Sequence, residues 1–259
     1  MKIVCIDGFN SYVGQNFYST YKKKYKILKF KSDINNINKL KNYVNKNKIS
    51  IFIRFAGLSR SSCEKNKKKC FSTNYEANKK FVNFIKTKKI KFIFLSTSHV
   101  YKASNKKIDE NCEKKPKNIY GKYKLKSENY IRKHLNDFLI LRVFNIFGPN
   151  QPKGYFFSDM QEKIKNKQKI FINNSYRDFI HVKEVSRFLD FSLKKDLKGI
   201  FNLGSGKSFS LHKVIKMISN KLNIPCNLIK SNKTDKIISS NRLIKNIGYK
   251  IRNEKNINF

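Results

Sequence analysis

The chain has 259 residues, which suffices for one large domain with a small appended lobe. No apolar run approaches the roughly 20 residues of a membrane-spanning helix, and the N-terminal run is interrupted by Asp7 too soon for a secretion signal, so we expect a cytoplasmic protein. Five scattered cysteines without a C-x-x-C pair disfavour a zinc site and a disulfide framework, so we expect reduced thiols.

The formal net charge of +41 comes from 58 Lys and Arg against 17 Asp and Glu, and it raises the question of nucleic-acid binding. The rest of the composition favours another origin. The chain lacks Trp, has only three alanines and uses far more lysine than arginine, as an A/T-rich genome would encode. We therefore expect most lysine runs to be solvated surface, which disfavours a nucleic-acid partner but leaves a charge that attracts phosphorylated substrates.

Strand-like and helix-like segments alternate in the N-terminal half of the chain. The strand-like segments are residues 2–6, 26–30, 50–55, 91–96 and 138–143, and the helix-like segments are residues 14–23, 37–44, 75–85 and 120–135. This alternation is typical of a parallel sheet covered by helices on both faces. The sequence therefore predicts a Rossmann-like, doubly wound α/β fold.

The pattern changes after Gly148-Pro149. A strand-like segment at residues 169–172 and helix-like segments at 182–193 and 211–222 precede a tail of irregular pattern. We expect residues 1–148 to form the main domain and residues 149–259 to form mainly a small C-terminal lobe, with residues of about 177–204 returning to the main domain.

A glycine-containing turn at residues 8–14 (GFNSYVG) joins the first strand to the first helix. Such a turn can place the pyrophosphate of a dinucleotide against free amides at the helix N-terminus. Ser11 stands where a third glycine is usual, so the motif alone fits a plain tight turn equally well. Its position directly after the first strand favours a cofactor site, formed by Gly8, Ser11, Tyr12, Val13 and Gly14.

The end of the second strand bears on the choice of cofactor. An acidic residue there would receive the adenosine ribose hydroxyls of NAD, but the chain places Lys31 and Ser32 before Asp33. This order slightly favours NADP. Because lysine is abundant at every position of this chain, NAD stays open.

Tyr120 and Lys124 are four residues apart at the expected start of a helix, which puts both side chains on one face. An ammonium beside a phenol stabilises the phenolate and lowers a pKa that begins near ~10, so the phenol can act as an acid or base near neutrality. In a chain rich in Tyr and Lys this spacing can arise by chance, so the surrounding motifs must show whether the pair is functional.

Five further motifs follow one another along the chain. They are residues 92–101 (FIFLSTSHVY), 120–128 (YGKYKLKSE), 141–149 (LRVFNIFGP), 177–182 (RDFIHV) and 201–206 (FNLGSG). In this order they resemble the motifs of extended short-chain dehydrogenases/reductases of the NAD-dependent epimerase/dehydratase family, which act mostly on nucleotide sugars. The resemblance spans nearly the whole chain, although Tyr123 replaces the family's usual small serine.

The resemblance implies a redox site with three catalytic residues. Tyr120 would carry the hydroxyl proton, Lys124 would lower the pKa of that phenol and bind the nicotinamide ribose, and Thr97 would hold the reacting oxygen. It also implies cofactor contacts from Phe55, Ala56, Gly57 and Asn74, and substrate contacts from Thr97, Ser98, Asn145 and Arg177.

For two of these substrate residues, structural alternatives stay open. Asn145 and Arg177 would donate to the substrate diphosphate. The alternative for Asn145 is a hydrogen bond within its loop, and the alternative for Arg177 is a surface ion pair with Asp178. His181 is expected to be structural, and no metal site is expected.

Two departures from the family narrow the reaction. Ser98-His99 replaces the Asp-Glu pair of its dehydratases, which disfavours a 4,6-dehydratase. Residues 232–235 (NKTD) stand where many epimerases have R-x-G-D, so an arginine used on nucleotide phosphates is missing. The nucleotide and the sugar therefore stay open.

These observations together favour an NAD(P)-dependent nucleotide-sugar epimerase or 4-keto reductase that transfers hydride at C4. Residues 1–148 would bind the cofactor, and the C-terminal lobe would bind the substrate. The family resemblance also favours a homodimer formed through the helices that include Tyr120. The alternative is a catalytically degenerate member of the family that binds RNA through its basic surface.

Overall fold

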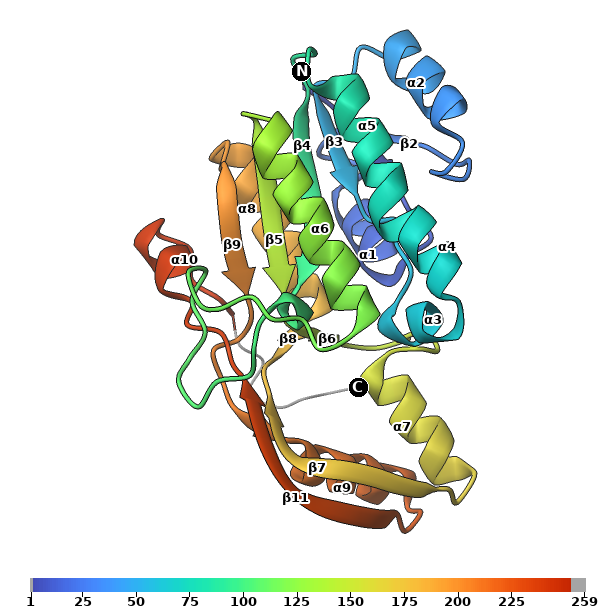
Figure 1. Cartoon of the computed structure of the whole chain (residues 1–259), viewed down its shortest axis with the longest axis vertical. Helices are drawn as coiled ribbons and strands as arrows, with labels where there is room; N and C mark the ends of the chain where they lie inside the picture. Colours follow the sequence, from blue (N-terminus) through green and yellow to red (C-terminus); the bar gives the residue numbers. More distant parts are fainter. Residues whose placement is uncertain (1, 253–259) are drawn as a thin grey trace.

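The computed structural model describes residues 2–252 and contains a six-stranded sheet in the order β2-β1-β3-β4-β5-β9, in which all pairs are parallel (Figure 1). Its strands are β1 (Ile3–Asp7), β2 (Lys26–Lys29), β3 (Ile51–Arg54), β4 (Lys91–Thr97), β5 (Phe138–Val143) and β9 (Gly199–Leu203). The predicted Rossmann-like, doubly wound α/β fold is confirmed.

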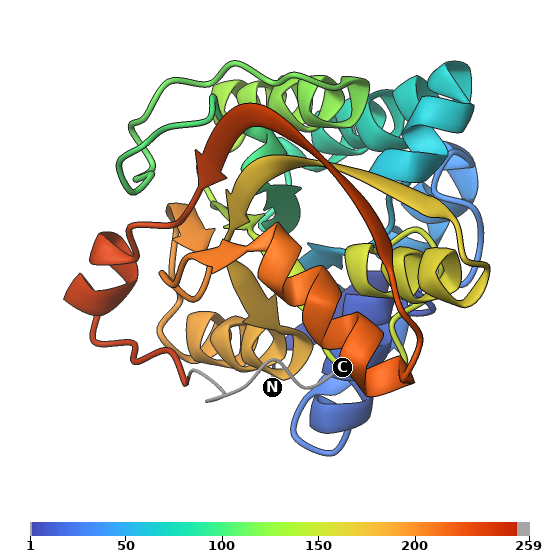
Figure 2. The same ribbon diagram turned by 90° about the horizontal axis from the view of Figure 1, so that it is seen from below.

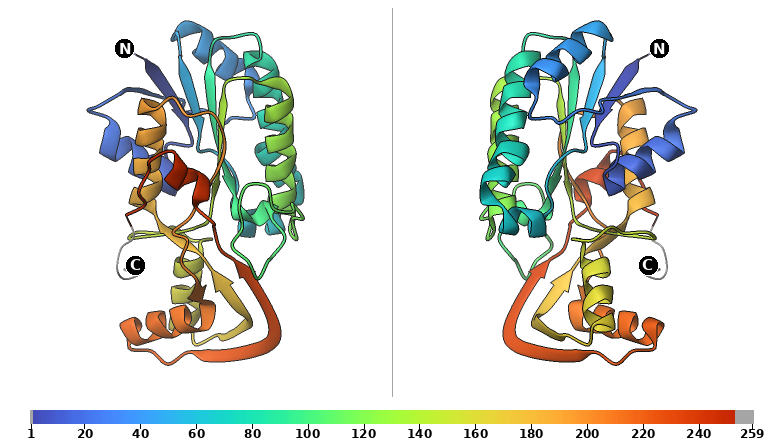
Figure 3. Two further views of the ribbon diagram at one scale, coloured as in Figure 1. Left: turned by 90° about the vertical axis from the view of Figure 1, so that its left-hand side faces the viewer. Right: turned by 90° about the vertical axis from the view of Figure 1, so that its right-hand side faces the viewer.

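Helices cover both faces of this sheet because alternate strand residues point in opposite directions (Figure 3). On one face, Ile53 packs in a cluster with Phe17 of α1 (Tyr12–Tyr21) and Phe188 of α8 (Val182–Lys194). On the other face, Phe52 packs with Phe81 of α5 (Ala77–Ile85), beside α2 (Ile37–Lys46) and α6 (Ile119–His134). None of the helices within residues 2–252 is long and apolar enough to cross a membrane.

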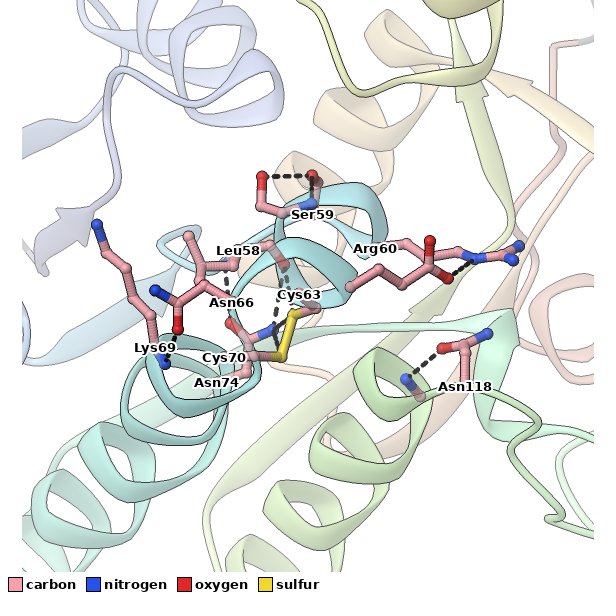
Figure 4. Close-up of a disulfide and its surroundings, with 12 residues drawn as sticks. Leu58, Ser59, Arg60, Cys63, Asn66, Lys69, Cys70, Asn74 and Asn118 are labelled. Atoms are coloured by element: carbon pink, nitrogen blue, oxygen red, sulfur yellow. Dashed lines mark hydrogen bonds and ion pairs between the residues drawn. A yellow bond between two sulfur atoms is a disulfide. The ribbon is translucent and has the colours of Figure 1, made fainter.

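The connection from β3 to α5 is built from three short helical pieces, α3 (Arg60–Lys65), α4 (Lys67–Phe71) and the π-helical turn η1 (Ser72–Glu76). Cys63 of α3 and Cys70 of α4 form a disulfide (Figure 4), so the expectation of five reduced thiols is wrong for this pair. Both cysteines are fully buried where the two helices meet. Their spacing of seven residues carried no signal in the sequence because the helix break between them was not visible there.

A smaller unit lies at one end of the molecule (Figures 1 and 2). It contains the sheet β10-β7-β11, formed by β10 (Phe209–Ser210), β7 (Lys169–Arg177) and β11 (Asn227–Ile237), and the helices α7 (Phe156–Lys165) and α9 (Leu211–Leu222). Phe157, Ile170 and Ile215 belong to its core. The expected irregular tail is therefore wrong in part, since it contains β11 and α10 (Arg242–Asn246).

Short pairings connect this unit to the main sheet. Strand β6 (Asn145–Phe147) pairs in parallel with β8 (Phe179–His181), and β9 then returns to pair with β5. The buried Asp178, between β7 and β8, accepts hydrogen bonds from the backbone amides of Ser205 at 2.6 Å and Ser239 at 3.0 Å. This carboxylate fixes the start of β8 against two distant loops.

Candidate functional site

The residues predicted to bind a cofactor lie at the carboxyl ends of β1, β2 and β3, where parallel α/β sheets form their binding crevice. After β1 the chain turns at Gly8, whose φ is +57°, and a Cβ there would lie 2.3 Å from the amide nitrogen of Ala56. Ser11 then caps α1, since its hydroxyl accepts from the amide of Gly14 at 3.2 Å. The turn therefore requires glycine and presents the first amides of a helix.

A buried ion pair lies beneath this turn. Arg54 donates from Nε to Asp7 Oδ2 at 2.8 Å, and the amide of Ala56 donates to Asp7 Oδ1 at 2.9 Å. The Arg54 guanidinium also donates to Asn78 Oδ1 at 2.7 Å. Sequence reasoning missed this network, although an acid and a base at the ends of two apolar strands were a visible signal. It fixes the end of β3 against the turn.

The remaining predicted cofactor residues differ in their surroundings. Tyr12 and Val13 are buried, and the Tyr12 hydroxyl donates to the carbonyl of Pro149 at 3.1 Å. Lys31 and Ser32 are exposed just after β2. Phe55 is buried, with its ring centroid 5.7 Å from that of Phe17. These side chains line or support one edge of the sheet.

Asn74 joins this edge to α6, whose Ser127 donates from its hydroxyl to the Asn74 carbonyl at 2.7 Å. Its amide accepts from the backbone nitrogen of Leu58 at 2.8 Å and donates to the carbonyl of the same residue at 3.1 Å (Figure 4). A Cβ at Gly57 would lie 3.2 Å from Asn74 Oδ1 and 3.5 Å from Lys124 Nζ. The predicted cofactor edge and the predicted catalytic lysine are therefore neighbours.

Tyr120 and Lys124 both belong to the first half of α6, which begins after the cap residue Asn118. Lys124 is buried, its Nζ donates to the carbonyl of Leu95 in β4 at 2.8 Å, and it lies 6.0 Å from the centroid of the Tyr120 ring. A hydrogen bond joins the side chains of Tyr120 and Thr97. The fold thus brings together the three side chains that the sequence assigned to catalysis.

The electrostatics of this trio differ from the expectation. Burial raises the pKa of the Tyr120 phenol above its usual range, the neighbouring Tyr155 adds to this, and the bond to Thr97 opposes it. The pKa of the phenol is therefore raised, where a lowering by Lys124 was expected. Burial, with a smaller effect of the nearby Arg54, lowers the pKa of Lys124 to about 8. The phenol is therefore protonated at neutral pH.

The predicted substrate residues lie near the junction with the smaller unit. Arg177 forms a two-pronged ion pair with Asp235 of β11, at 2.8 Å from Nη2 to Oδ2 and 3.2 Å from Nη1 to Oδ1. The alternative pair with Asp178 is therefore wrong. Asn145 donates from Nδ2 to the carbonyl of Asp178 at 3.0 Å, and Ser98 is buried in the turn η2 (Ser98–Val100). Sequence reasoning singled out residues 232–235 but missed the pairing of Asp235 with Arg177, because β11 was not predicted.

The two histidines nearest these motifs have defined partners. His181 caps α8, since its Nδ1 accepts from the amide of Lys183 at 3.2 Å. His99 lies in η2 directly after the Thr97-Ser98 pair, with its Nδ1 3.1 Å from Asn118 Nδ2. Within residues 2–252, no group of three or more His, Cys, Asp or Glu side chains is arranged to hold a metal ion.

Comparison with known proteins gives a match to the model of the NAD dependent epimerase/dehydratase family over residues 11–204. An ADP-L-glycero-D-manno-heptose-6-epimerase of Brachyspira hyodysenteriae is 29% identical over 199 residues, which are 71% of this chain and 62% of that protein. The matched stretch therefore spans less than two thirds of that relative.

Solved structures of low sequence identity share the whole fold. UDP-glucose 4-epimerase of Thermus thermophilus, in complex with NAD, has a TM-score of 0.82 at 14% identity, covering 96% of this chain and 94% of its own. The dTDP-4-dehydrorhamnose reductase of Bacillus anthracis, in complex with NADP, has a TM-score of 0.82 at 20% identity, covering 96% and 93%. At these identities the likeness concerns the fold.

Proposed function

The chain belongs to the NAD-dependent epimerase/dehydratase family, and on this premise we propose that it is a nucleotide-sugar epimerase or 4-keto reductase that uses NAD(P) and transfers hydride at C4. The observation that carries the proposal is the meeting of Tyr120, Lys124 and Thr97, with Lys124 beside Gly57 at the end of β3. No dehydratase activity is proposed, because Ser98-His99 follows Thr97 in place of two acids.

The residues of the crevice fit a dinucleotide. A Cβ at position 8 would clash with the backbone of Ala56, so the tight turn after β1 needs glycine, and it leads directly into the N-terminus of α1, where a pyrophosphate would bind. When bound, the nicotinamide would supply or accept the hydride. Buried Lys124 would bind the nicotinamide ribose through its ammonium, and exposed Lys31 with Ser32 slightly favours NADP over NAD.

The chemistry of the side chains follows from their protonation. In the direction of ketone reduction, the protonated Tyr120 phenol donates its proton to the oxygen at C4 as hydride reaches the carbon, leaving a phenolate and an alcohol. In the direction of alcohol oxidation, the phenolate takes that proton back. The Thr97 hydroxyl holds the oxygen in register, and the Lys124 ammonium stabilises the phenolate once it forms.

The substrate would be held across the junction of the two units. Arg177, oriented by Asp235, would donate from its guanidinium to a diphosphate. The Asn145 side-chain amide would donate to the same group after it releases its hydrogen bond to the Asp178 carbonyl. In this proposal residues 1–148 bind the cofactor and the C-terminal lobe binds most of the nucleotide sugar. A cytoplasmic homodimer remains the expected form of the protein.

Mass spectrometry of small molecules that co-purify with the native protein tests this function. We expect a nicotinamide dinucleotide, a nucleotide sugar or both to co-purify. If neither does, the protein is incubated with NAD, NADP and UDP-glucose and purified again, and recovery of none of these molecules would then contradict the proposal. The fate of the cofactor during turnover distinguishes the epimerase from the reductase. A retained cofactor indicates the epimerase, whereas stoichiometric release of NADP⁺ with each substrate indicates the reductase.

A further inference from the structure

His99 contacts the catalytic tyrosine directly. Its ring meets Tyr120 edge to face, with ring centroids 5.8 Å apart and planes at 76°. The backbone of the same residue donates to Thr97 Oγ1 at 3.2 Å. His99 is therefore placed against two of the three catalytic side chains.

The orientation of the neighbouring Asn118 amide defines the tautomer of this histidine. Asn118 Oδ1 accepts the amide proton of Gly121 at 2.8 Å, as the cap of α6 (Figure 4). The NH₂ group of Asn118 is thereby turned to His99 Nδ1, 3.1 Å away. Because an amide NH₂ only donates, Nδ1 must accept, and the proton of a neutral imidazole must lie on Nε2.

The ring is neutral at physiological pH. Burial lowers the pKa of His99 to about 4, Arg60 and Arg177 act in the same direction, and Glu64 opposes them. Tyr120, the titratable neighbour in ring contact, is itself protonated. His99 therefore offers one fixed hydrogen-bond donor and carries no charge.

That donor faces no protein acceptor. Within residues 2–252 the only hydrogen bond of the His99 ring is the one to Asn118, and the ring keeps some solvent exposure. The two arginines that act on it come from different units, Arg60 from α3 and Arg177 from β7. The ring that carries this donor is therefore partly exposed, packs on Tyr120 and lies within the electrostatic reach of Arg177, the residue of the proposed diphosphate site.

We propose that His99 is a substrate-contacting residue whose Nε2–H donates a hydrogen bond to a sugar oxygen beside the one that Tyr120 serves. The inference rests on the proposed function and adds a specificity contact to it. A second fixed donor would hold the sugar ring in one orientation, so that the carbon at C4 meets the nicotinamide. A neutral donor suits a hydroxyl, because it binds an uncharged oxygen without stabilising an anion there.

Two substitutions separate this role from a structural one. In His99→Gln, the amide nitrogen can reach the position of Nε2, but the acceptor for Asn118 is lost. In His99→Asn, the short amide can accept from Asn118, but no donor reaches the sugar. The first variant therefore keeps the proposed substrate contact, and the second keeps the structural contact.

The experiment measures single-turnover hydride transfer between the bound cofactor and a nucleotide sugar, followed by the absorbance of the reduced nicotinamide. The probe is UDP-glucose or, if UDP-glucose does not react with the wild type, the nucleotide sugar that co-purifies with the native protein. We expect His99→Asn to lower the rate at subsaturating nucleotide sugar about tenfold and His99→Gln to keep most of it. Cofactor affinity should be unchanged in both variants, and the melting temperature, measured on the same samples, should fall only in His99→Gln, which loses the acceptor for Asn118.

Each other outcome overturns the inference. If His99→Asn matches the wild type and His99→Gln fails, His99 acts only as the partner of Asn118, and the proposed function still stands. If both variants match the wild type, the side chain contacts no substrate. If the wild type binds no nicotinamide dinucleotide and transfers no hydride to or from one, the proposed function fails, and this inference fails with it.

Discussion

A Cβ atom at Gly121 would lie 2.3 Å from the carbonyl oxygen of His99. The first turn of α6, which carries Tyr120, is therefore docked directly on the segment that follows Thr97. This close approach explains the glycine next to Tyr120, because a larger residue would push the Tyr120 phenol away from Thr97.

Gly121→Ala tests this packing. Helix propensity alone favours alanine by about 1 kcal/mol, but overpacking against a backbone oxygen costs about 1–3 kcal/mol, and a backbone atom yields less readily than a side chain. We expect a lower free energy of unfolding in urea and a large loss of turnover. The exposed neighbour variant Lys122→Ala should change neither. A Gly121→Ala protein as stable and active as the wild type would contradict the packing argument.

Asp235→Asn tests how Arg177 is held. The substitution removes the charge that orients the guanidinium, so we expect KM for the nucleotide sugar to rise several-fold while cofactor affinity stays constant. Asp190→Asn, which removes an acid of helix α8 that pairs with Lys24 and Lys194, should leave KM unchanged. An equal effect of both variants on KM would indicate that only net charge matters.

The Asp235 pair also has a defined pH window. Burial raises the pKa of this carboxyl, but hydrogen bonds and the charge of Arg177 outweigh it and leave the pKa below its ordinary value. The pair therefore stabilises the fold fully above pH of about 4 and loses its contribution only as the pH falls further.

Most strands and helices were predictable because their apolar residues repeat with the period of one element. The helix predicted at residues 211–222 is α9 (Leu211–Leu222) in the structure. Strand β11 was not predictable, because its many polar residues show no alternation and its parallel pairing with β7 arises from contacts distant in sequence. The break between α3 and α4 escaped prediction for the same reason.

The site was predictable as far as spacing and motif order determine it. Tyr120 and Lys124 share a face as expected from their separation. Their electrostatics were not predictable, since the pKa of each depends on burial and on neighbours from other elements, such as Tyr155 and Arg54. Hydrogen-bond partners such as Asn118 and Asp235 likewise depend on tertiary structure.

The disulfide between Cys63 and Cys70 should contribute measurable stability. It closes a short loop, with a sequence separation of 7, which corresponds to about 2 kcal/mol in the chain-entropy model. We expect the double variant Cys63→Ser/Cys70→Ser, or the wild type treated with a thiol reductant, to unfold at a lower temperature. Cys226→Ser, at a free cysteine, is the control. Equal melting of oxidised wild type and double variant would contradict a stabilising role.

Acidification should weaken the fold through His99. With a native pKa of about 4 against roughly 6.5 in an unfolded chain, the unfolded state binds the proton first as the pH falls. The stabilisation is therefore complete above pH of about 6.5 and is lost as the pH approaches 4. Urea unfolding at pH 7 and pH 5 should show a larger loss in the wild type than in His99→Gln. Equal losses would show that this ring is not held neutral.

Tyr120→Phe tests the central claim most directly, because it removes one hydroxyl from the proposed proton donor and leaves the ring against His99. The measurement pairs the affinity for NADH or NADPH, read from nicotinamide fluorescence, with single-turnover hydride transfer to or from a nucleotide sugar. We expect nearly unchanged cofactor affinity and a loss of hydride transfer of at least about 100-fold. An unchanged rate of hydride transfer in Tyr120→Phe would contradict the central claim.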